Sequence, residues 1–351
     1  MDPMELNSKR MKKKMANQSA TRKSTLSSSK IRDAVYAFRD ARVLLTAYEL
    51  DLFTALEDGA KTSAEVARKI RTNLRATDRL MNALCAAGFL RKKKEKFSNT
   101  PLTFRFLVKG NPDYMAGLMH QVSLWKTWST LTEAVRTGSA VVGRDSVNNR
   151  QVDWLEAFIA AMHMRALQQA PAVVGLLDLR GVKRVLDVGG GSGIFSMAFV
   201  RATKGIRSVV FDLPNVVSLT RRYVEAEHLG DVITTAEGDY TSDSLGGEFD
   251  LVFLSAIIHS NSPKTNKLLF KKAFNALNPK GQLVVSDFIM DDDRVSPRAG
   301  AFFSLNMLVG TRDGDTYTES EVRSWMEEAG FKTVRRKGTP FETDLMIGRR
   351  K

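Results

Sequence analysis

The sequence predicts an α/β protein whose C-terminal half is an open, largely parallel sheet and whose N-terminal part is mainly helical. Two observations predict the sheet. After Gly181, short apolar runs alternate with helical stretches, and a glycine-rich turn in VLDVGGGSGIF directly follows the first run. Alternation of this kind is typical of parallel sheets with helices on both faces, which bind ligands at the carboxyl ends of their strands.

The composition is that of a globular protein. The chain is 43% hydrophobic, and its length of 351 residues favours two domains over one. No apolar run approaches the ~20 residues of a membrane helix. The N-terminus lacks the apolar segment of a secretory signal, so we expect a cytoplasmic protein. The single cysteine, Cys85, excludes an internal disulfide and a thiolate metal site, and we expect no metal.

Nearly half of the net charge of +14 lies at the N-terminus. Residues 1–30 hold eight Lys or Arg against Asp2 and Glu5, a net of +6, and they are rich in Ser and Thr. Such a segment has too few apolar residues to form a core. We therefore predict a disordered basic tail over residues 1–30.

Residues 31–105 carry the pattern of a winged helix. Apolar residues recur at helical spacing from Ile31 onwards, which predicts a long amphipathic helix. Thr62-Ser63-Ala64-Glu65 is a capping box, and a further helix follows from about Ala76 to Gly88. The segment FLRKKKEKFSNT then has apolar residues on either side of a charged turn, which predicts a short hairpin.

A winged helix raises the alternative of a DNA-binding regulator. The hairpin has four lysines that suit phosphate contacts: Lys92, Lys93, Lys94 and Lys96. The preceding helix, which would enter the major groove, offers Arg75, Arg79 and Asn82. Its other residues are mainly Ala, Leu and Met, a composition that favours packing over base recognition. We therefore disfavour nucleic acid as a partner.

Two further segments complete the chain. Residues 106–175 look helical and form a connecting region. Residues 176–351 contain seven candidate strands, the first five separated or flanked by helical stretches: KRVLDV, RSVVFDL, DVITTAEG, FDLVFLS, GQLVVSDF, FKTVRRKG and FETDLMIGRR. The stretch from Met290 to Asp315 has the length and composition of a functional loop with an internal helix.

The glycine-rich turn predicts a nucleotide-like ligand that carries positive charge. Gly189, Gly191 and Gly193 allow a tight turn, and the next helix directs its N-terminus at the ligand. A dinucleotide fingerprint would need glycine where this chain has Ile194, and the Gly-Lys-Ser/Thr of a P-loop is absent. Asp187 would repel a pyrophosphate and suits a cation. S-adenosyl-L-methionine, with its ammonium and sulfonium groups, has this charge.

Acidic residues also follow the next two candidate strands. Asp212, in FDLP, is placed to accept hydrogen bonds from two ribose hydroxyls. Asp239, in EGDY, is placed to bind an adenine amino group, with Tyr240 against the ring. Any one of these aspartates alone is equally consistent with a turn or a helix cap. Three carboxylates at successive strand ends favour a ligand site.

With these motifs the sequence resembles the class I S-adenosylmethionine-dependent O-methyltransferases that carry an N-terminal winged-helix dimerisation domain. The resemblance covers about residues 31–350 and rests on DVGGGSG, FDLP, GDY, HSNSP and SLNMLVG, in that order. It implies a Rossmann-like class I methyltransferase sheet over residues 176–351. It also implies a homodimer paired through the N-terminal domain and a small hydrophobic or aromatic acceptor.

The resemblance implies roles for the matching residues. His259 falls on the family's general base and Asp287 on the first of two acidic residues that orient it. The loop at Gly189 would hold the methionine part of the cofactor. Further expected cofactor contacts are Asp187, Gly191, Gly193, Asp212, Leu213, Asp239, Tyr240 and Ser255. Expected acceptor contacts, from residues 106–175 and the later helix, are Phe158, Met162, Phe303, Asn306 and Met307.

The sequence departs from the family pattern at four positions. Ser255 and Ala256 replace a lysine and a tryptophan, Thr311 replaces an asparagine, and Thr316 stands where the second acidic residue would be. A phenol with a pKa of about 10 is mostly protonated at pH 7, so a histidine titrating near neutrality suits its deprotonation. We therefore expect O-methylation of a hydroxyl, with C- or N-methylation or non-methylating chemistry as alternatives.

Overall fold

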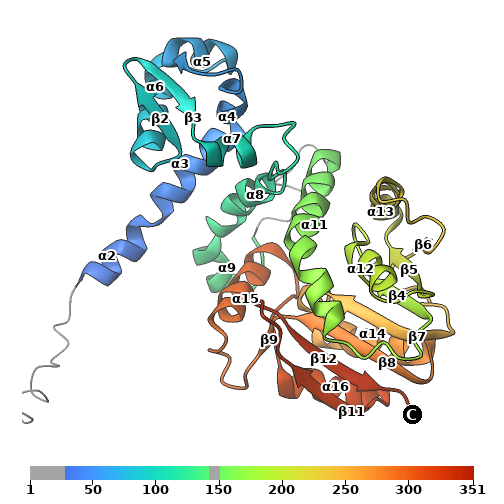
Figure 1. Cartoon of the computed structure of the whole chain (residues 1–351). Coiled ribbons are helices and arrows are strands. Elements are labelled where there is room, and N and C mark those ends of the chain that lie inside the picture. Colours follow the sequence, from blue (N-terminus) through green and yellow to red (C-terminus); the bar gives the residue numbers. More distant parts are fainter. Residues whose placement is uncertain (1–27, 142–150) are drawn as a thin grey trace, which may run out of the picture.

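The computed structural model describes residues 28–141 and 151–351, with only the backbone described for residues 151–154. Figure 1 shows a smaller N-terminal lobe joined through a group of helices to a larger α/β lobe. The predicted basic tail therefore lies outside the described residues except for its last three positions, and a helix already begins at Ser29.

The N-terminal lobe has the helices and hairpin of a winged helix. Its elements are α2 (Ser29–Tyr36), α3 (Phe38–Glu49), α4 (Leu52–Ala55), β1 (Lys61–Thr62), α5 (Ser63–Lys69), α6 (Leu74–Ala86), β2 (Leu90–Lys93), β3 (Lys96–Asn99) and α7 (Pro101–Leu107). The predicted capping box and hairpin are both present. The long helix predicted from Ile31 is nearly continuous across Ala37, which keeps helical angles, and it ends at Glu49.

Three helices connect the lobes: α8 (Leu118–Trp128), α9 (Leu131–Thr137) and α11 (Gln151–Gly175). The long helix α11 packs against α8 on one side and against the α/β lobe on the other. Its C-terminal half packs over one face of the sheet of the larger lobe (Figure 1). Residues 142–150, which separate α9 from α11 in the chain, lie outside the described residues.

The larger lobe contains a seven-stranded sheet in the order β11-β12-β8-β7-β4-β5-β6. Its strands are β4 (Arg184–Val188), β5 (Arg207–Asp212), β6 (Ile233–Glu237), β7 (Phe249–Ser255), β8 (Leu277–Asp287), β11 (Lys332–Lys337) and β12 (Asp344–Arg349). The first five pair in parallel, and β12 pairs antiparallel to both of its neighbours. All seven candidate strands are therefore present.

Both faces of this sheet are buried. In β7, Leu251 and Phe253 belong to one hydrophobic cluster while Val252 and Leu254 belong to another. Helices α11, α12 (Ile194–Ala202) and α13 (Pro214–Ala226) supply the first cluster, and α14 (Pro263–Ala276) and α16 (Glu319–Ala329) supply the second. Continuous apolar runs are what strands buried on both faces require.

The strand order reverses at β4, whose neighbours are β5 on one side and β7 on the other. A reversal of this kind opens a crevice at the carboxyl ends of the strands. A 3₁₀ turn (Ile258–Ser260) follows β7. Beyond β8, the short strands β9 (Ile289–Met290) and β10 (Tyr317–Thr318) pair in parallel and enclose α15 (Arg298–Gly310), the predicted internal helix. Sequence patterns did not predict this two-stranded sheet.

The described residues contain neither a membrane-spanning helix nor a cluster of metal ligands. No helix there is long and apolar enough to cross a membrane. No group of three or more His, Cys, Asp or Glu side chains there has the arrangement of a metal site.

Candidate functional site

A cavity of about 600 Å³ opens at the carboxyl ends of the parallel strands, between the sheet, α11 and α15. Its size is within the range of small-molecule sites. Most of the predicted site residues line it, namely Phe158, Met162, Asp187, Gly189, Gly191, Asp212, Leu213, Asp239, Tyr240, Ser255, His259, Phe303, Asn306 and Met307. Gly193 and Asp287 do not. Gly193 lies at the N-terminus of α12, and Asp287 lies behind His259.

The glycine-rich turn has the backbone that its sequence predicts. Gly189, Gly191 and Gly193 have φ of 64°, 56° and 76°, in the left-handed region that favours glycine. The N–H of Gly189 donates to the carbonyl of Phe211 at 2.7 Å, which ties the turn to β5. A Cβ on Gly189 would overlap the side chain of Ile257, so the turn packs directly against the segment that leads to His259.

Asp187 is a buried carboxylate with one unsatisfied oxygen. Only 1% of the residue is exposed. Its Oδ2 accepts hydrogen bonds from the backbone N–H of Ser196 at 3.2 Å and from the hydroxyl of Ser196 at 2.8 Å. Its Oδ1 has no partner. Burial raises the pKa of this carboxyl to about 7.

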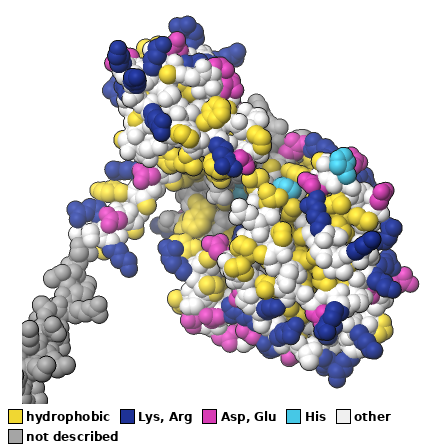
Figure 2. Space-filling model, in the orientation of Figure 1, with side chains coloured by type: hydrophobic (Ala, Val, Ile, Leu, Met, Phe, Trp, Pro, Cys, Tyr) yellow, Lys and Arg dark blue, Asp and Glu magenta, His cyan; other side chains and the backbone are white. Residues whose placement is uncertain are grey.

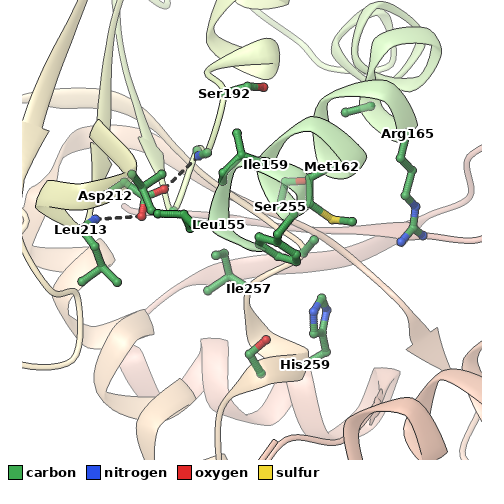
Figure 3. A pocket seen from close by; sticks show the side chains of 18 of the residues that line it. Leu155, Ile159, Met162, Arg165, Ser192, Asp212, Leu213, Ser255, Ile257 and His259 are labelled. Atoms are coloured by element: carbon green, nitrogen blue, oxygen red, sulfur yellow. Dashed lines mark hydrogen bonds between the residues drawn. The ribbon is translucent and has the colours of Figure 1, made fainter. Parts of the chain in front are cut away.

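Asp212, the last residue of β5, links the glycine-rich turn to the start of α13 through two hydrogen bonds. Its Oδ2 accepts from the N–H of Gly191 at 2.9 Å and its Oδ1 from the N–H of Leu213 at 2.8 Å, as the dashed lines in Figure 3 show. Each oxygen keeps a second lone pair for a ligand. Burial raises the pKa of this carboxyl, and the two N–H groups oppose that rise.

Asp239 and Tyr240 follow β6. The Oδ1 of Asp239 accepts from the N–H and the hydroxyl of Thr241 at 2.8 and 2.7 Å, which fixes the direction of its side chain. The Tyr240 hydroxyl donates to Asn261 at 3.0 Å, and Asn261 in turn donates to Asn266 at 3.1 Å. These bonds hold the tyrosine ring at the wall of the cavity and connect it to the turn that carries His259.

His259 is oriented by Asp287. Its Nδ1 lies 2.7 Å from the Asp287 Oδ1, and both residues are buried. The carboxylate also accepts from the backbone N–H groups of Ile258 at 3.1 Å and of Phe288 at 2.8 Å. Since an ionised carboxylate only accepts, the neutral ring carries its proton on Nδ1, and Nε2 is left as the proton acceptor.

Sheet register explains why these two residues meet. Ser255 at the end of β7 pairs with Ser286 in β8, so the turn after β7 lies beside the end of β8. The ring of Phe303 meets the His259 ring edge-on, with 4.8 Å between the two ring centroids. Thr316, the position of the second acidic residue in the family pattern, donates from its hydroxyl to the carbonyl of Gly300 at 3.3 Å. Its hydroxyl thus fixes α15 and does not orient His259.

The predicted acceptor residues form the apolar part of the cavity. Phe158 and Met162 come from α11, and Phe303, Asn306 and Met307 come from α15. The Oδ1 of Asn306 accepts from the indole N–H of Trp128 at 2.9 Å, so its oxygen is already bound within the protein. Asn306 was predicted as a polar contact for the acceptor, and its amide N–H₂ group and the second lone pair of its oxygen remain for that role.

Sequence reasoning missed several residues of the site. Ile257 and Arg165 line the cavity. His163, on α11, lies 3.0 Å from the hydroxyl of Ser192 in the glycine-rich turn and stacks on Tyr223. Burial lowers the pKa of His163. A histidine or arginine inside an amphipathic helix carries no local signal of a ligand site, although the spacing of three from Met162 to Arg165 places them near one face.

Comparisons with known proteins agree with this geometry. The profile of an O-methyltransferase domain matches residues 128–332, and the profile of an O-methyltransferase dimerisation domain matches residues 33–109. The chain belongs to the O-methyltransferase family. The fold prediction and the predicted class of enzyme, a methyltransferase, are thereby confirmed.

Individual relatives cover nearly the whole chain. The 3-hydroxy-5-methyl-1-naphthoate 3-O-methyltransferase of Streptomyces sahachiroi is 33% identical over 84% of this chain and 86% of that protein. The tetracenomycin polyketide synthesis 8-O-methyl transferase TcmO of Streptomyces glaucescens is 30% identical over 90% and 94%. The solved structure of PigF with SAH, a Serratia protein, has a TM-score of 0.84 at 26% identity and covers 93% of this chain and 100% of that one.

The residues of the cavity fit S-adenosylmethionine, the cofactor expected for this family. The unsatisfied Oδ1 of Asp187 offers a buried acceptor to an ammonium group. The left-handed turn at Gly189 and Gly191 leaves its backbone open to close approach. The second lone pairs of Asp212 suit two ribose hydroxyls, and the Asp239 Oδ2 suits an amino group.

Proposed function

We propose that this methyltransferase methylates a hydroxyl of a small aromatic or polyketide-like molecule, with S-adenosylmethionine as methyl donor and His259 as general base. The observation that carries the proposal is the Asp287–His259 pair at the same cavity as the glycine-rich turn and the three predicted cofactor carboxylates. When bound, S-adenosylmethionine supplies an electrophilic methyl group on its sulfonium.

His259 is suited to remove the hydroxyl proton. Forming a free phenolate at pH 7 costs about 4 kcal/mol, since a phenol has a pKa of about 10. The Nε2 of a ring held through its Nδ1 can take that proton during the reaction, and Asp287 stabilises the imidazolium that results. Phe303 keeps water from one side of the ring.

The apolar residues Phe158, Met162, Phe303 and Met307 support an aromatic or polyketide-like acceptor. The names of the two Streptomyces relatives, a naphthoate methyltransferase and a methyltransferase of polyketide synthesis, point to the same class. Both are named as O-methyltransferases, which favours a hydroxyl over carbon or nitrogen as the site of methylation.

The N-terminal lobe is proposed to pair two subunits. Several large apolar side chains on α2 and α3 are exposed in the single chain, with Ile31 at 70%, Val35 at 58% and Phe38 at 52%. These three residues are spaced four and three positions apart, which places them on one side of the helix, and exposed apolar residues grouped in this way mark an interaction surface. The match to a dimerisation domain supports a second copy of the chain as the partner.

The DNA-binding alternative receives less support. In α6, Asn82 donates to Asp78 at 2.9 Å and accepts from Lys92 at 2.9 Å, so its amide is already bound. Figure 2 shows Lys and Arg side chains on both lobes, interspersed with acidic and apolar side chains on the face that is drawn. Both observations count against recognition of DNA.

The proposal is tested by product analysis. The purified chain is incubated with methyl-labelled S-adenosylmethionine and a panel of hydroxylated aromatic and polyketide acceptors. We expect an O-methylated product, identified by mass spectrometry and NMR. A product methylated at carbon or nitrogen would contradict the hydroxyl assignment, and the panel includes acceptors with free amino groups for that reason.

A further inference from the structure

The cavity has a guanidinium group in its wall, that of Arg165. Among the described residues that line the cavity, Arg165 is the only Lys or Arg. Figure 3 shows Asp212 on the left of the pocket and Arg165 on the right, with His259 below both and nearer to Arg165 in this view. The cavity thus offers a carboxylate at its cofactor end and a guanidinium at the opposite end.

The guanidinium of Arg165 is only weakly engaged by the protein. Its side chain is 33% exposed, and the carboxylate of Glu342, itself 67% exposed, lies 4.0 Å away. An ion pair at that distance in contact with water contributes little. No hydrogen bond links the guanidinium to another side chain in the part of the chain that the structure describes. Its five N–H donors therefore remain available to a ligand.

A row of aromatic rings connects Arg165 to His259. The guanidinium lies over the ring of Phe288 at 5.0 Å. Phe288 stacks on Phe303 at 4.1 Å with an interplanar angle of 20°, and Phe303 meets His259 edge-on. Phe288 directly follows Asp287, so the segment that orients His259 also supports the arginine. Arg165 and His259 thus lie at the two ends of one row of contacting rings.

We propose that the acceptor is an aromatic hydroxy acid whose carboxylate binds Arg165 while its hydroxyl reaches His259. This inference rests on the proposed O-methylation and narrows its substrate class. A guanidinium and a carboxylate match each other in a planar, two-bond geometry. The aromatic ring between them packs against Phe303, so a rigid acceptor is held at both polar ends.

In the alternative role, Arg165 only stabilises the packing of α11 against the loop at Glu342 through their ion pair and does not contact the acceptor. Two variants separate these roles. Arg165→Met keeps an unbranched apolar side chain beside Phe288 and removes the charge. Glu342→Gln is the matched control, because it removes the ion pair within the protein and leaves the guanidinium in place.

The experiment compares hydroxynaphthoic acids with their methyl esters. Binding to the complex of the protein with S-adenosylhomocysteine is measured by calorimetry, and methylation by kcat and KM. We expect the wild type and Glu342→Gln to prefer the acids about 10- to 100-fold, as expected for a charged hydrogen-bonded pair. Arg165→Met is expected to lose that preference through KM, with kcat changed little.

The binding measurement separates this inference from the proposed function. If the acids bind in preference to the esters but no hydroxyl is methylated, the proposed function fails and the role of Arg165 stands. Equal or tighter binding of the esters by the wild type overturns the role of Arg165, as does an undiminished preference for the acids in Arg165→Met. A complex that binds none of the acids overturns it as well.

Discussion

The Cα of Gly314 lies so close to the backbone carbonyl of His259 that a side chain at this position would overlap the carbonyl oxygen. The next residue, Asp315, donates its N–H to that same carbonyl at 3.0 Å. The loop after α15 is therefore packed against the turn that carries the proposed base. Its fit depends on the absence of a Cβ at residue 314.

Gly314→Ala is expected to lower kcat about tenfold or more, because displacing His259 by a fraction of an ångström misaligns it with the hydroxyl. Binding of S-adenosylmethionine, measured by calorimetry, should stay within about twofold, since the cofactor carboxylates are elsewhere. Gly230→Ala is the matched control, because open space surrounds that position. An unchanged kcat in Gly314→Ala would show that the position of His259 tolerates the shift.

His259→Ala is expected to reduce kcat by about 10²- to 10⁴-fold while cofactor affinity is retained. Asp287→Asn should cause a loss of at least about 10²-fold, because an amide cannot accept from His259, Ile258 and Phe288 together. Thr316→Val is the control, since its hydroxyl bonds to Gly300, and its kcat should change less than about threefold. Undiminished turnover in His259→Ala would remove this residue as the base.

Asp212→Ala is expected to weaken binding of S-adenosylmethionine at least about tenfold. The change removes the proposed ribose acceptor and leaves the N–H groups of Gly191 and Leu213 without their partner. The exposed Asp231 provides a control for the loss of one negative charge, and Asp231→Ala should bind normally. Equal affinities of the two variants, measured by calorimetry, would contradict the site assignment.

The affinity for S-adenosylmethionine is expected to rise with pH. Burial raises the pKa of Asp187 to about 7 in the ligand-free fold, against an ordinary value of 3.8, so the fold favours the neutral carboxyl. A bound ammonium favours the ionised form, so binding should strengthen about five- to tenfold from pH 6 to pH 8. Calorimetry at both values measures this change.

The same titration predicts how stability depends on pH in the absence of ligand. Since the folded pKa of Asp187 is above the unfolded one, its contribution to the free energy of unfolding is largest below about pH 4 and declines as the pH rises towards about 7. Asp187→Asn should bind the cofactor weakly. Neither its affinity for the cofactor nor its free energy of unfolding should keep the pH dependence expected from Asp187. A pH dependence that persists in Asp187→Asn would assign it to another group.

A double variant, Ile31→Asp with Phe38→Asp, is expected to shift the protein from dimer to monomer in light scattering, because both side chains are exposed on the proposed pairing face. Lys204→Glu, on the other lobe, changes charge at an exposed position and should leave the assembly unchanged. A dimer that survives the double variant would place the interface elsewhere.

The strand ends and the glycine-rich turn could be predicted from the sequence because their signals are local. Strands buried on both faces appear as continuous apolar runs, and a left-handed turn appears as glycine at alternate positions. The positions of Asp212 and Asp239 follow directly from where those runs end. The seven strands and the position of Asp187 near the end of β4 all belong to this class.

Other parts of the site depend on contacts between distant segments. The partner of Trp128 is Asn306, and the partner of Ser192 is His163. No local pattern specifies such pairs, because they depend on how α8, α11 and α15 pack against the sheet. For the same reason the arginine at position 165 has the appearance of an ordinary solvated residue in the sequence.

Helix α11 reaches both the donor side and the acceptor side of the cavity. Its lining residues recur every three or four positions along one face: Leu155, Phe158, Ile159, Met162, Arg165, Ala166 and Gln169. The strands and their carboxylates need not change when this face does. Exchange of a few side chains on a single helix is therefore an evolutionary route by which one scaffold acquires new acceptors while its methyl-donor site is inherited intact.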